Sequence, residues 1–202
     1  INYFKVIIIY SLFITLIFNF HLLNFFGTKQ GLKYADTFNE AYFFITGYFL
    51  IFTIISSIFF LLGQRFFLKP LIIILFFISA LNYYFLTVLG IIIDETIIQS
   101  TIDSLKERNW GEINDLLNLR YFAYLFFLGF LPSLLLCFIK IEYPSLKKEI
   151  TIRLISTMLL FLITLSLIYA NYKNISFIAR GSKLIKERIV PIYFLSNIKD
   201  YF

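Results

Sequence analysis

Acidic and polar side chains gather where a long apolar stretch ends, in and after the segment GIIIDETIIQS at residues 90–100. Carboxylates can pair with an ammonium group, and amide or hydroxyl side chains can hydrogen-bond to a phosphate or a sugar. We therefore interpret five side chains as candidates for binding a lipid headgroup: Asp94, Glu95, Glu112, Gln99 and Ser100.

The surrounding segment has the pattern of amphipathic helices. Ile98, Ile102 and Leu105 fall at i, i+4 and i+7, and a second apolar set follows Gly111. We predict one or two helices over about 95–118 that lie in the membrane interface, with a Trp as anchor. The alternative is a solvated cap that closes the bundle and binds nothing.

Composition places these residues in an integral membrane protein. The 202-residue chain is 60% hydrophobic and 15% charged, whereas about a quarter of the residues of a soluble domain are charged. A net charge of +6 suits anionic lipid headgroups, and we expect no nucleic acid partner. One His, one Cys and no Gly-rich phosphate loop predict no metal site or cofactor in this segment.

Five apolar stretches approach the roughly 20 residues that cross a bilayer. They predict an all-α fold with five transmembrane helices, at about 6–26, 41–62, 70–93, 121–139 and 154–170. Residues 1–171 would form the membrane domain, and Pro70 would take the first position of the third helix. Residues 172–202 are basic and aromatic and read as a linker on the membrane surface.

The basic residues of the short loops predict the orientation. Loops 63–69 and 140–153 hold six Lys and Arg in 21 residues, whereas loops 27–40 and 94–120 hold five in 41. Cytoplasmic loops carry the excess of positive charge, so the N-terminus should be cytoplasmic and the acidic loops outside. The basic tail opposes this rule, although long translocated segments often escape it.

Polar residues inside the spans carry two interpretations. Asn19, near the outer end of the first span, could contact a lipid headgroup, whereas hydrogen bonding between helices is the simpler role for Asn19, His21 and Asn82. Pro132 predicts a kink in the fourth span.

Three motifs follow one another in a distinctive order. The third span and its continuation read YYFLTVLGIIIDETIIQS, the next segment reads EINDLL, and the tail reads SFIARGSKLIKERIVP, with Arg180, Lys183, Arg188 and Pro191. Together with Asn19, this order resembles the N-terminal membrane domain of bacterial phosphoethanolamine transferases. Ile97 and Ser100 stand where that family usually has Met and Asn.

The resemblance implies a domain that anchors an enzyme in the bacterial inner membrane and presents its lipid substrates, with a periplasmic C-terminus. A sulfatase-like catalytic domain with a Thr nucleophile and zinc would follow the linker. It would move phosphoethanolamine from phosphatidylethanolamine to lipid A or another envelope acceptor, a lipopolysaccharide modification associated with polymyxin resistance. Because the chain begins with Ile1 rather than Met, we expect it to be part of a longer protein.

Two alternatives stay open at this stage. Lipoteichoic acid synthases also pair five spans with a similar extracellular domain, but they transfer glycerol phosphate, and the loop pattern argues against them. A non-enzymatic five-span scaffold would fit the spans alone. Transport is disfavoured, because ionised residues are missing from the middles of the spans and no internal repeat is visible.

Overall fold

The structure is a computed structural model that describes residues 1–22, 40–91, 99–100, 106, 111, 118–172 and 189–190. Its elements are α1 (Tyr3–Phe18), α4 (Glu40–Leu62), α5 (Leu68–Tyr84), the π-helix η1 (Phe85–Leu89), α8 (Leu119–Tyr124), the π-helix η2 (Leu125–Phe130), α9 (Leu131–Phe138) and α10 (Leu146–Ala170). Within the described residues, five helical stretches are long and apolar enough to cross a membrane. The prediction of an all-α, five-span membrane fold is confirmed.

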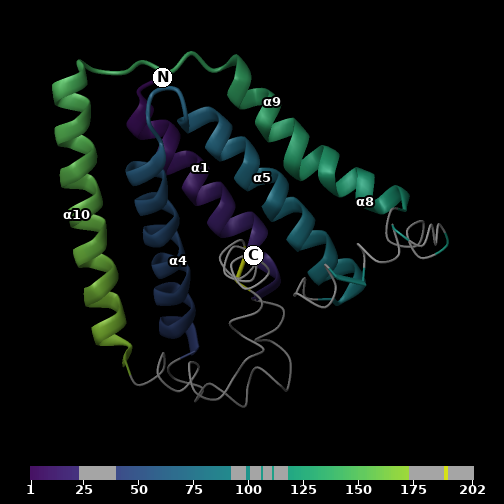
Figure 1. The fold of residues 1–202 in the computed structure, drawn as a ribbon. Coiled ribbons are helices and arrows are strands. Elements are labelled where there is room, and N and C mark those ends of the chain that lie inside the picture. The colour runs from purple at the N-terminus through teal and green to yellow at the C-terminus, as the bar shows by residue number, and fades with distance from the viewer. Residues whose placement is uncertain are drawn as a thin grey trace.

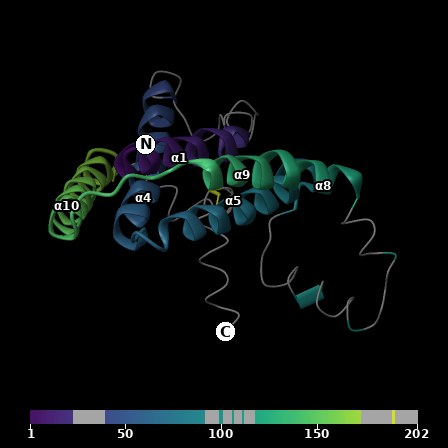
Figure 2. The same cartoon turned by 90° about the horizontal axis from the view of Figure 1, so that it is seen from above.

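The helices lie side by side with α1 at the centre. Figure 1 shows α10, α4, α1, α5 and the continuous α8–η2–α9 helix in this order. Helix α1 packs on both α4 and α5, and Figure 2 shows the bundle from above, with α10 at one edge beside α4. Tyr3, Ile7, Tyr10, Ile14 and Phe18 recur every three or four residues and are buried, so one stripe of α1 forms the core.

The bundle has two ends, which we call the N-terminal end and the loop end. The N-terminal end holds Asn2, the turn 63–67 between α4 and α5, and the segment 139–145, which crosses from α9 to α10 (Figure 1). Asn2 and Glu142 form a β-bridge there. The loop end is where α1, η1 and α10 end and where α4 and α8 begin.

Two irregular turns follow from single residues. Gly90 ends η1 with φ of 68°, a left-handed conformation that glycine adopts without strain. The π-helix η2 comes just before Pro132, whose ring would clash with the carbonyl of Leu128 in a regular helix. The wider turn relieves that clash, so the helix continues.

Two helix starts differ from the sequence-based predictions. Pro70 is the third residue of α5 rather than the first, because α5 begins at Leu68. It still lies in the first turn, where backbone N–H groups have no partner within the helix. Helix α10 begins at Leu146, before the apolar stretch predicted to span the membrane from Leu154.

Helix α10 stands at the periphery of the bundle. It packs mainly on α4, where the Thr164 hydroxyl donates a hydrogen bond to the Thr53 hydroxyl at 3.0 Å. Its other face is apolar and exposed, with Leu154, Met158 and Leu162 each more than half accessible. An apolar helix surface of this kind fits contact with lipid tails.

Candidate functional site

A pair of hydrogen bonds at the loop end joins the first helix to the tail. Asn19 caps the C-terminus of α1, and its side chain is fully buried. Its Nδ2 donates to the Val190 carbonyl at 3.0 Å, and its Oδ1 accepts from the Val190 N–H at 3.1 Å. Both polar groups of one backbone unit are therefore satisfied by one amide side chain, 171 residues away in sequence.

The same residue also connects α1 to α4. The Tyr48 hydroxyl donates to the Asn19 carbonyl at 2.7 Å, and Asn19 Nδ2 also lies 3.3 Å from the Ile14 carbonyl. Val190 itself is 4% exposed, so this part of the tail belongs to the core at the loop end. Three segments of the chain thus meet at Asn19.

His21 lies next to this junction and takes a structural position. It is buried, and its Nδ1 is 3.1 Å from the Phe18 carbonyl. A carbonyl only accepts hydrogen bonds, so Nδ1 carries the proton. The ring also contacts the Tyr83 ring, with centroids 5.9 Å apart.

Four tyrosines from two helices form an aromatic cluster beside His21. Tyr83 and Tyr84 come from α5, and Tyr121 and Tyr124 come from α8, with centroid distances of 5.4–6.0 Å between the helices. Such edge-to-face and tilted pairs stabilise a contact beyond the area that they bury. The cluster fixes the start of α8 against the end of α5.

A hydrogen bond couples this cluster to the segment that leads into α8. The Tyr84 hydroxyl donates to Oδ1 of Asn118 at 3.0 Å. The same Oδ1 accepts the Tyr121 N–H at 3.0 Å, which makes Asn118 the N-cap of α8. The end of the loop between the third and fourth spans is thereby tied to the bundle.

Only some of the predicted headgroup residues lie within the described part of the chain. Gln99 and Ser100 are helical and exposed. Asn19 uses its amide on protein groups, which favours its hydrogen-bonding role over contact with a lipid. Asn82 donates to the Ile78 carbonyl of its own helix, and its side chain makes no bond to another helix among the described residues. The remaining candidates lie outside the described residues: Asp94, Glu95, Glu112, Arg180, Lys183, Arg188 and Pro191, with most of the interfacial segment 95–118.

Sequence reasoning missed an ion-pair network at the N-terminal end. Glu149 is 3% exposed, and its carboxylate lies 3.0 Å from Arg65 Nη2 and 4.0 Å from Arg153 Nη1. Arg153 also donates to the carbonyls of Phe60 and Leu61 at the end of α4, at 2.9 and 2.7 Å. The Glu149 and Arg153 spacing of four residues was the available signal.

Tyr143 completes this network as an aromatic neighbour. The Arg65 guanidinium lies 5.3 Å from its ring centroid, a cation–π distance. Burial raises the pKa of the Tyr143 phenol above its usual value of 10.0, and the nearby Glu149 charge adds to this rise. The phenol therefore stays neutral at physiological pH.

No group of three or more His, Cys, Asp or Glu side chains within the described ranges is placed to hold a metal ion. The only cysteine in the sequence, Cys137, is exposed as a free thiol. The described site is therefore an arrangement for holding segments in place, built from hydrogen bonds and aromatic rings, without catalytic metal ligands.

Comparison with known proteins identifies the family. Two curated relatives from Escherichia coli are similar over most of the chain. Phosphatidylethanolamine transferase Mcr-1 is 29% identical over 152 residues, which cover 74% of this chain and 26% of Mcr-1. Phosphatidylethanolamine transferase Mcr-2 is 28% identical over 141 residues, which cover 68% of this chain and 26% of Mcr-2. The matched part is thus about a quarter of the length of either relative.

A solved structure shares the fold. The integral membrane lipooligosaccharide phosphoethanolamine transferase A (EptA) from Neisseria meningitidis superposes with a TM-score of 0.80 at 23% identity. The superposition covers 98% of this chain and 36% of EptA. The profile of the family described as phosphoethanolamine transferase EptA/EptB matches residues 50–202, about three quarters of the sequence. This chain therefore belongs to the phosphoethanolamine transferase EptA/EptB family, and its five-helix bundle is the family's N-terminal membrane domain.

Proposed function

We propose that this bundle is the membrane-anchoring and lipid-presenting domain of an enzyme that moves phosphoethanolamine from phosphatidylethanolamine to lipid A or a similar envelope acceptor. Both lipids reside in the membrane, so a catalytic domain held at its surface meets them at a high effective concentration. The proposal places that catalytic domain, and the zinc it would need, after residue 202 of a longer polypeptide. The described residues contain no cluster suited to zinc.

The Asn19–Val190 pair is the observation that carries the proposal. Two hydrogen bonds to one buried backbone unit fix the tail to the loop end of the bundle. Whatever follows Val190 in the chain then starts from a defined position beside α1. A catalytic domain attached there would work at a set height above the lipid headgroups.

The loop between the third and fourth spans is held at this same end, by Tyr84 and Asn118. Its predicted interfacial helices would form the surface on which headgroups lie, beside the start of the catalytic domain. Gln99 and Ser100 are exposed in helical conformation, which suits contact with a phosphate. Asp94, Glu95 and Glu112 would pair with the ammonium group of phosphoethanolamine.

The arrangement of basic residues supports a bacterial inner-membrane protein whose N-terminal end faces the cytoplasm. Seven basic residues belong to the turns and helix ends at or beside that end: Lys5, Arg65, Lys69, Lys140, Lys147, Lys148 and Arg153. An excess of Lys and Arg in short loops is typical of the cytoplasmic side. The loop end, with the tail, would then face the periplasm.

The test is to express the natural full-length protein in a bacterium without its own phosphoethanolamine transferases and to analyse its lipid A by mass spectrometry. We expect lipid A to gain phosphoethanolamine and the cells to become less sensitive to polymyxin. Transfer of glycerol phosphate instead would favour the synthase alternative, and no transfer to any envelope lipid would favour a scaffold.

A shorter chain tests whether catalysis belongs to the domain proposed to follow the membrane bundle. Residues 1–202, expressed alone and shown to insert in the membrane, should leave lipid A unmodified. Modification by this segment alone would contradict the placement of catalysis after residue 202.

A further inference from the structure

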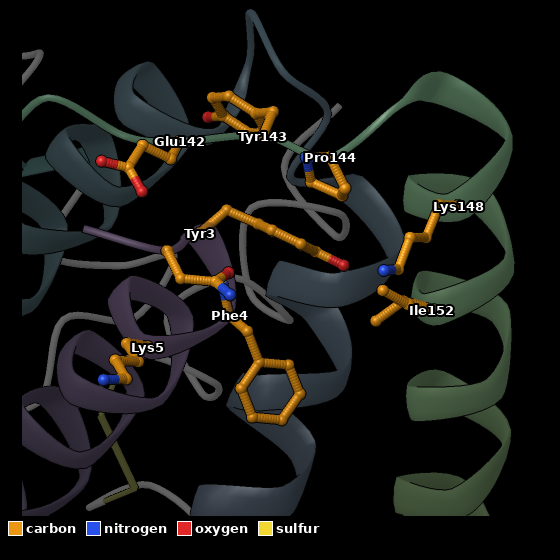
Figure 3. A pocket seen from close by; sticks show the side chains of 9 residues that line it. Tyr3, Phe4, Lys5, Glu142, Tyr143, Pro144, Lys148 and Ile152 are labelled. Carbon is orange, nitrogen blue, oxygen red and sulfur yellow. The ribbon is translucent and has the colours of Figure 1, made fainter.

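The N-terminal end of the bundle carries a pocket that the proposed function does not use. Its volume is about 460 Å³, within the range of roughly 300–1,000 Å³ of small-molecule sites. It lies between the first turn of α1, the 139–145 segment and the first turns of α10, as Figure 3 shows. Its lining residues are Asn2, Tyr3, Phe4, Lys5, Glu142, Tyr143, Pro144, Lys148 and Ile152.

A buried hydroxyl without a partner faces this pocket. Tyr3 is 1% exposed, and its hydroxyl makes no hydrogen bond within the described part of the chain. An unsatisfied buried polar group costs roughly 1–3 kcal/mol and calls for an explanation. A ligand atom that accepts a hydrogen bond would supply the missing partner.

A lysine ammonium points at the same place. Figure 3 shows the Tyr3 ring reaching toward Lys148, with its hydroxyl turned to the Lys148 amine. No hydrogen bond or ion pair is found for Lys148 among the described residues. The Lys148 ammonium only donates hydrogen bonds, and the Tyr3 hydroxyl can donate one. An anionic oxygen placed between them would accept from both groups.

The charges around the pocket favour an anion. Lys5 also lines it. The Arg65 guanidinium lies over the ring of the lining residue Tyr143, and Arg153 shares the Glu149 carboxylate with Arg65. Two carboxylates oppose the two lysines, Lys5 and Lys148, and the two arginines. Glu149 is already engaged by both arginines, and Glu142 is 77% exposed, where water screens its charge.

The apolar part of the lining continues toward the lipid-facing surface. Phe4 is 41% exposed and contacts Phe60 of α4, and Ile152 lies one turn along α10 from Lys148. Beyond them, α10 exposes Ile150, Leu154 and Ile155. A molecule with an anionic head and apolar tails fits this surface, because its tails can leave the pocket along α10 in the hydrocarbon layer.

We propose that this pocket binds the headgroup of an anionic phospholipid, with the phosphate between the Lys148 ammonium and the Tyr3 hydroxyl. Basic pockets between transmembrane helices are typical sites for anionic headgroups. The site lies at the end of the bundle opposite to the Asn19–Val190 pair, so it is separate from the surface proposed for the transferase substrates. The bound lipid would join α1 to α10, which otherwise packs mainly on α4.

The experiment measures lipid binding by the natural full-length protein in detergent, with native mass spectrometry and added phosphatidylglycerol. Lys148→Gln should weaken the first bound lipid about fivefold, because one lysine near an anionic lipid contributes about that factor. Tyr3→Phe should weaken it roughly three- to tenfold. Lys147→Gln is the matched control, since it removes the same charge from the same helical turn outside the pocket.

The folding of Tyr3→Phe separates a binding role from a structural one. The hydroxyl has no protein partner to lose, and phenylalanine keeps the ring that stacks on Tyr143 at 5.8 Å. The lipid-free variant should therefore unfold at the same denaturant concentration as the unchanged protein, or at a higher one. Lower stability of the lipid-free variant would overturn the assignment of this hydroxyl to a ligand.

The same binding experiment is repeated with phosphatidylcholine and with inorganic phosphate. Preference for phosphatidylglycerol over phosphatidylcholine, lost in Lys148→Gln and kept in Lys147→Gln, supports the proposal. Equal losses in both lysine variants would point to general attraction and overturn it. So would equal affinity for phosphatidylcholine, or displacement of the lipid by inorganic phosphate. None of these readouts depends on transferase activity.

Discussion

The two ends of the bundle hold their segments by different chemistry. At the N-terminal end, a buried carboxylate and two guanidinium groups join α10 to the turn between α4 and α5. At the loop end, neutral groups hold the segments together: one asparagine amide, a tyrosine hydroxyl and a set of aromatic rings. The first end depends on charge and the second on hydrogen bonding.

This difference has a consequence for what each end tolerates. A charged group that loses its partner in a buried site is very costly, because the remaining charge is left without water. A neutral hydrogen bond contributes about 1 kcal/mol, and the loss of one partner costs somewhat more. Changes at the N-terminal end should therefore reduce global stability, whereas changes at the loop end should release single segments.

The largest effect is expected from Glu149→Ala. The change leaves the guanidinium groups of Arg65 and Arg153 together without a carboxylate. Arg153 is mostly buried but Arg65 is 36% exposed, so we expect about 3 kcal/mol of destabilisation, the lower part of the usual range. Unfolding in mixed detergent micelles with increasing SDS would measure it.

Glu142→Ala serves as the control for this change. Glu142 is 77% exposed, and exposed ion pairs contribute little. Its unfolding curve should nearly match that of the unchanged protein. Equal destabilisation by the two variants would show that the charge network is not the principal support of this end.

Asn19→Leu should release the tail. Leucine has the same number and branching of side-chain heavy atoms as asparagine but leaves the N–H and carbonyl of Val190 without partners, at a cost of about 1–3 kcal/mol. Hydrogen exchange at the Val190 amide should accelerate by roughly ten- to a hundredfold. In the full-length enzyme, phosphoethanolamine transfer should fall, because its catalytic domain would lose its fixed starting point.

The matched control for the tail is Asn82→Leu. Among the described residues, the Asn82 side chain bonds only to the Ile78 carbonyl within α5. Exchange at Val190 should stay unchanged in this variant. Faster exchange in both variants would attribute the effect to general loosening of the bundle.

The sequence was sufficient for the helices but not for these supports. Apolar length alone predicts a segment such as 41–62, because a bilayer requires about 20 apolar residues whatever their neighbours are. It does not predict the start of α10 at Leu146, where Glu149 and Arg153 find partners on other segments and keep charged turns helical. Hydropathy is a property of each segment alone, whereas the ion pair between Glu149 and Arg65 joins residues that are far apart in sequence.

The candidate site, too, was only partly predictable from the sequence. Asn19 was recognisable as a polar residue at membrane depth, but its partner Val190 is an ordinary apolar residue 171 positions away. No periodicity or motif reports a hydrogen bond to a backbone group. The role of a buried amide therefore depends on which distant segment returns to it, and only the fold supplies that.

Tyr84→Phe tests the loop end with a smaller change. Loss of the hydroxyl removes one hydrogen bond to Asn118 and leaves the aromatic cluster in place. We expect about 1 kcal/mol of destabilisation, with faster hydrogen exchange in the first turn of α8. Tyr121→Phe keeps the same ring contacts and serves as the control, and it should leave that exchange rate unchanged.

The smallest effect concerns pH at the N-terminal end. The pKa of Tyr143 is raised by burial and by Glu149, so the unfolded chain loses this proton near pH 10 while the folded chain still holds it. Between pH 10.0 and the higher folded-state pKa, the unfolded state binds fewer protons, and stability must fall as pH rises. Below pH 10 the phenol is neutral in both states and contributes no pH dependence.

Tyr143→Phe isolates that contribution. Phenylalanine keeps a ring under the Arg65 guanidinium and beside Tyr3, but it has no proton to lose. The stability of this variant should therefore fall less steeply above pH 10 than that of the unchanged protein, while the two curves run parallel below it. SDS unfolding at a series of pH values measures the difference, and identical slopes above pH 10 would contradict the raised pKa. A difference in slope would show that burial and the nearby Glu149 charge hold the Tyr143 phenol in its neutral form above pH 10.0.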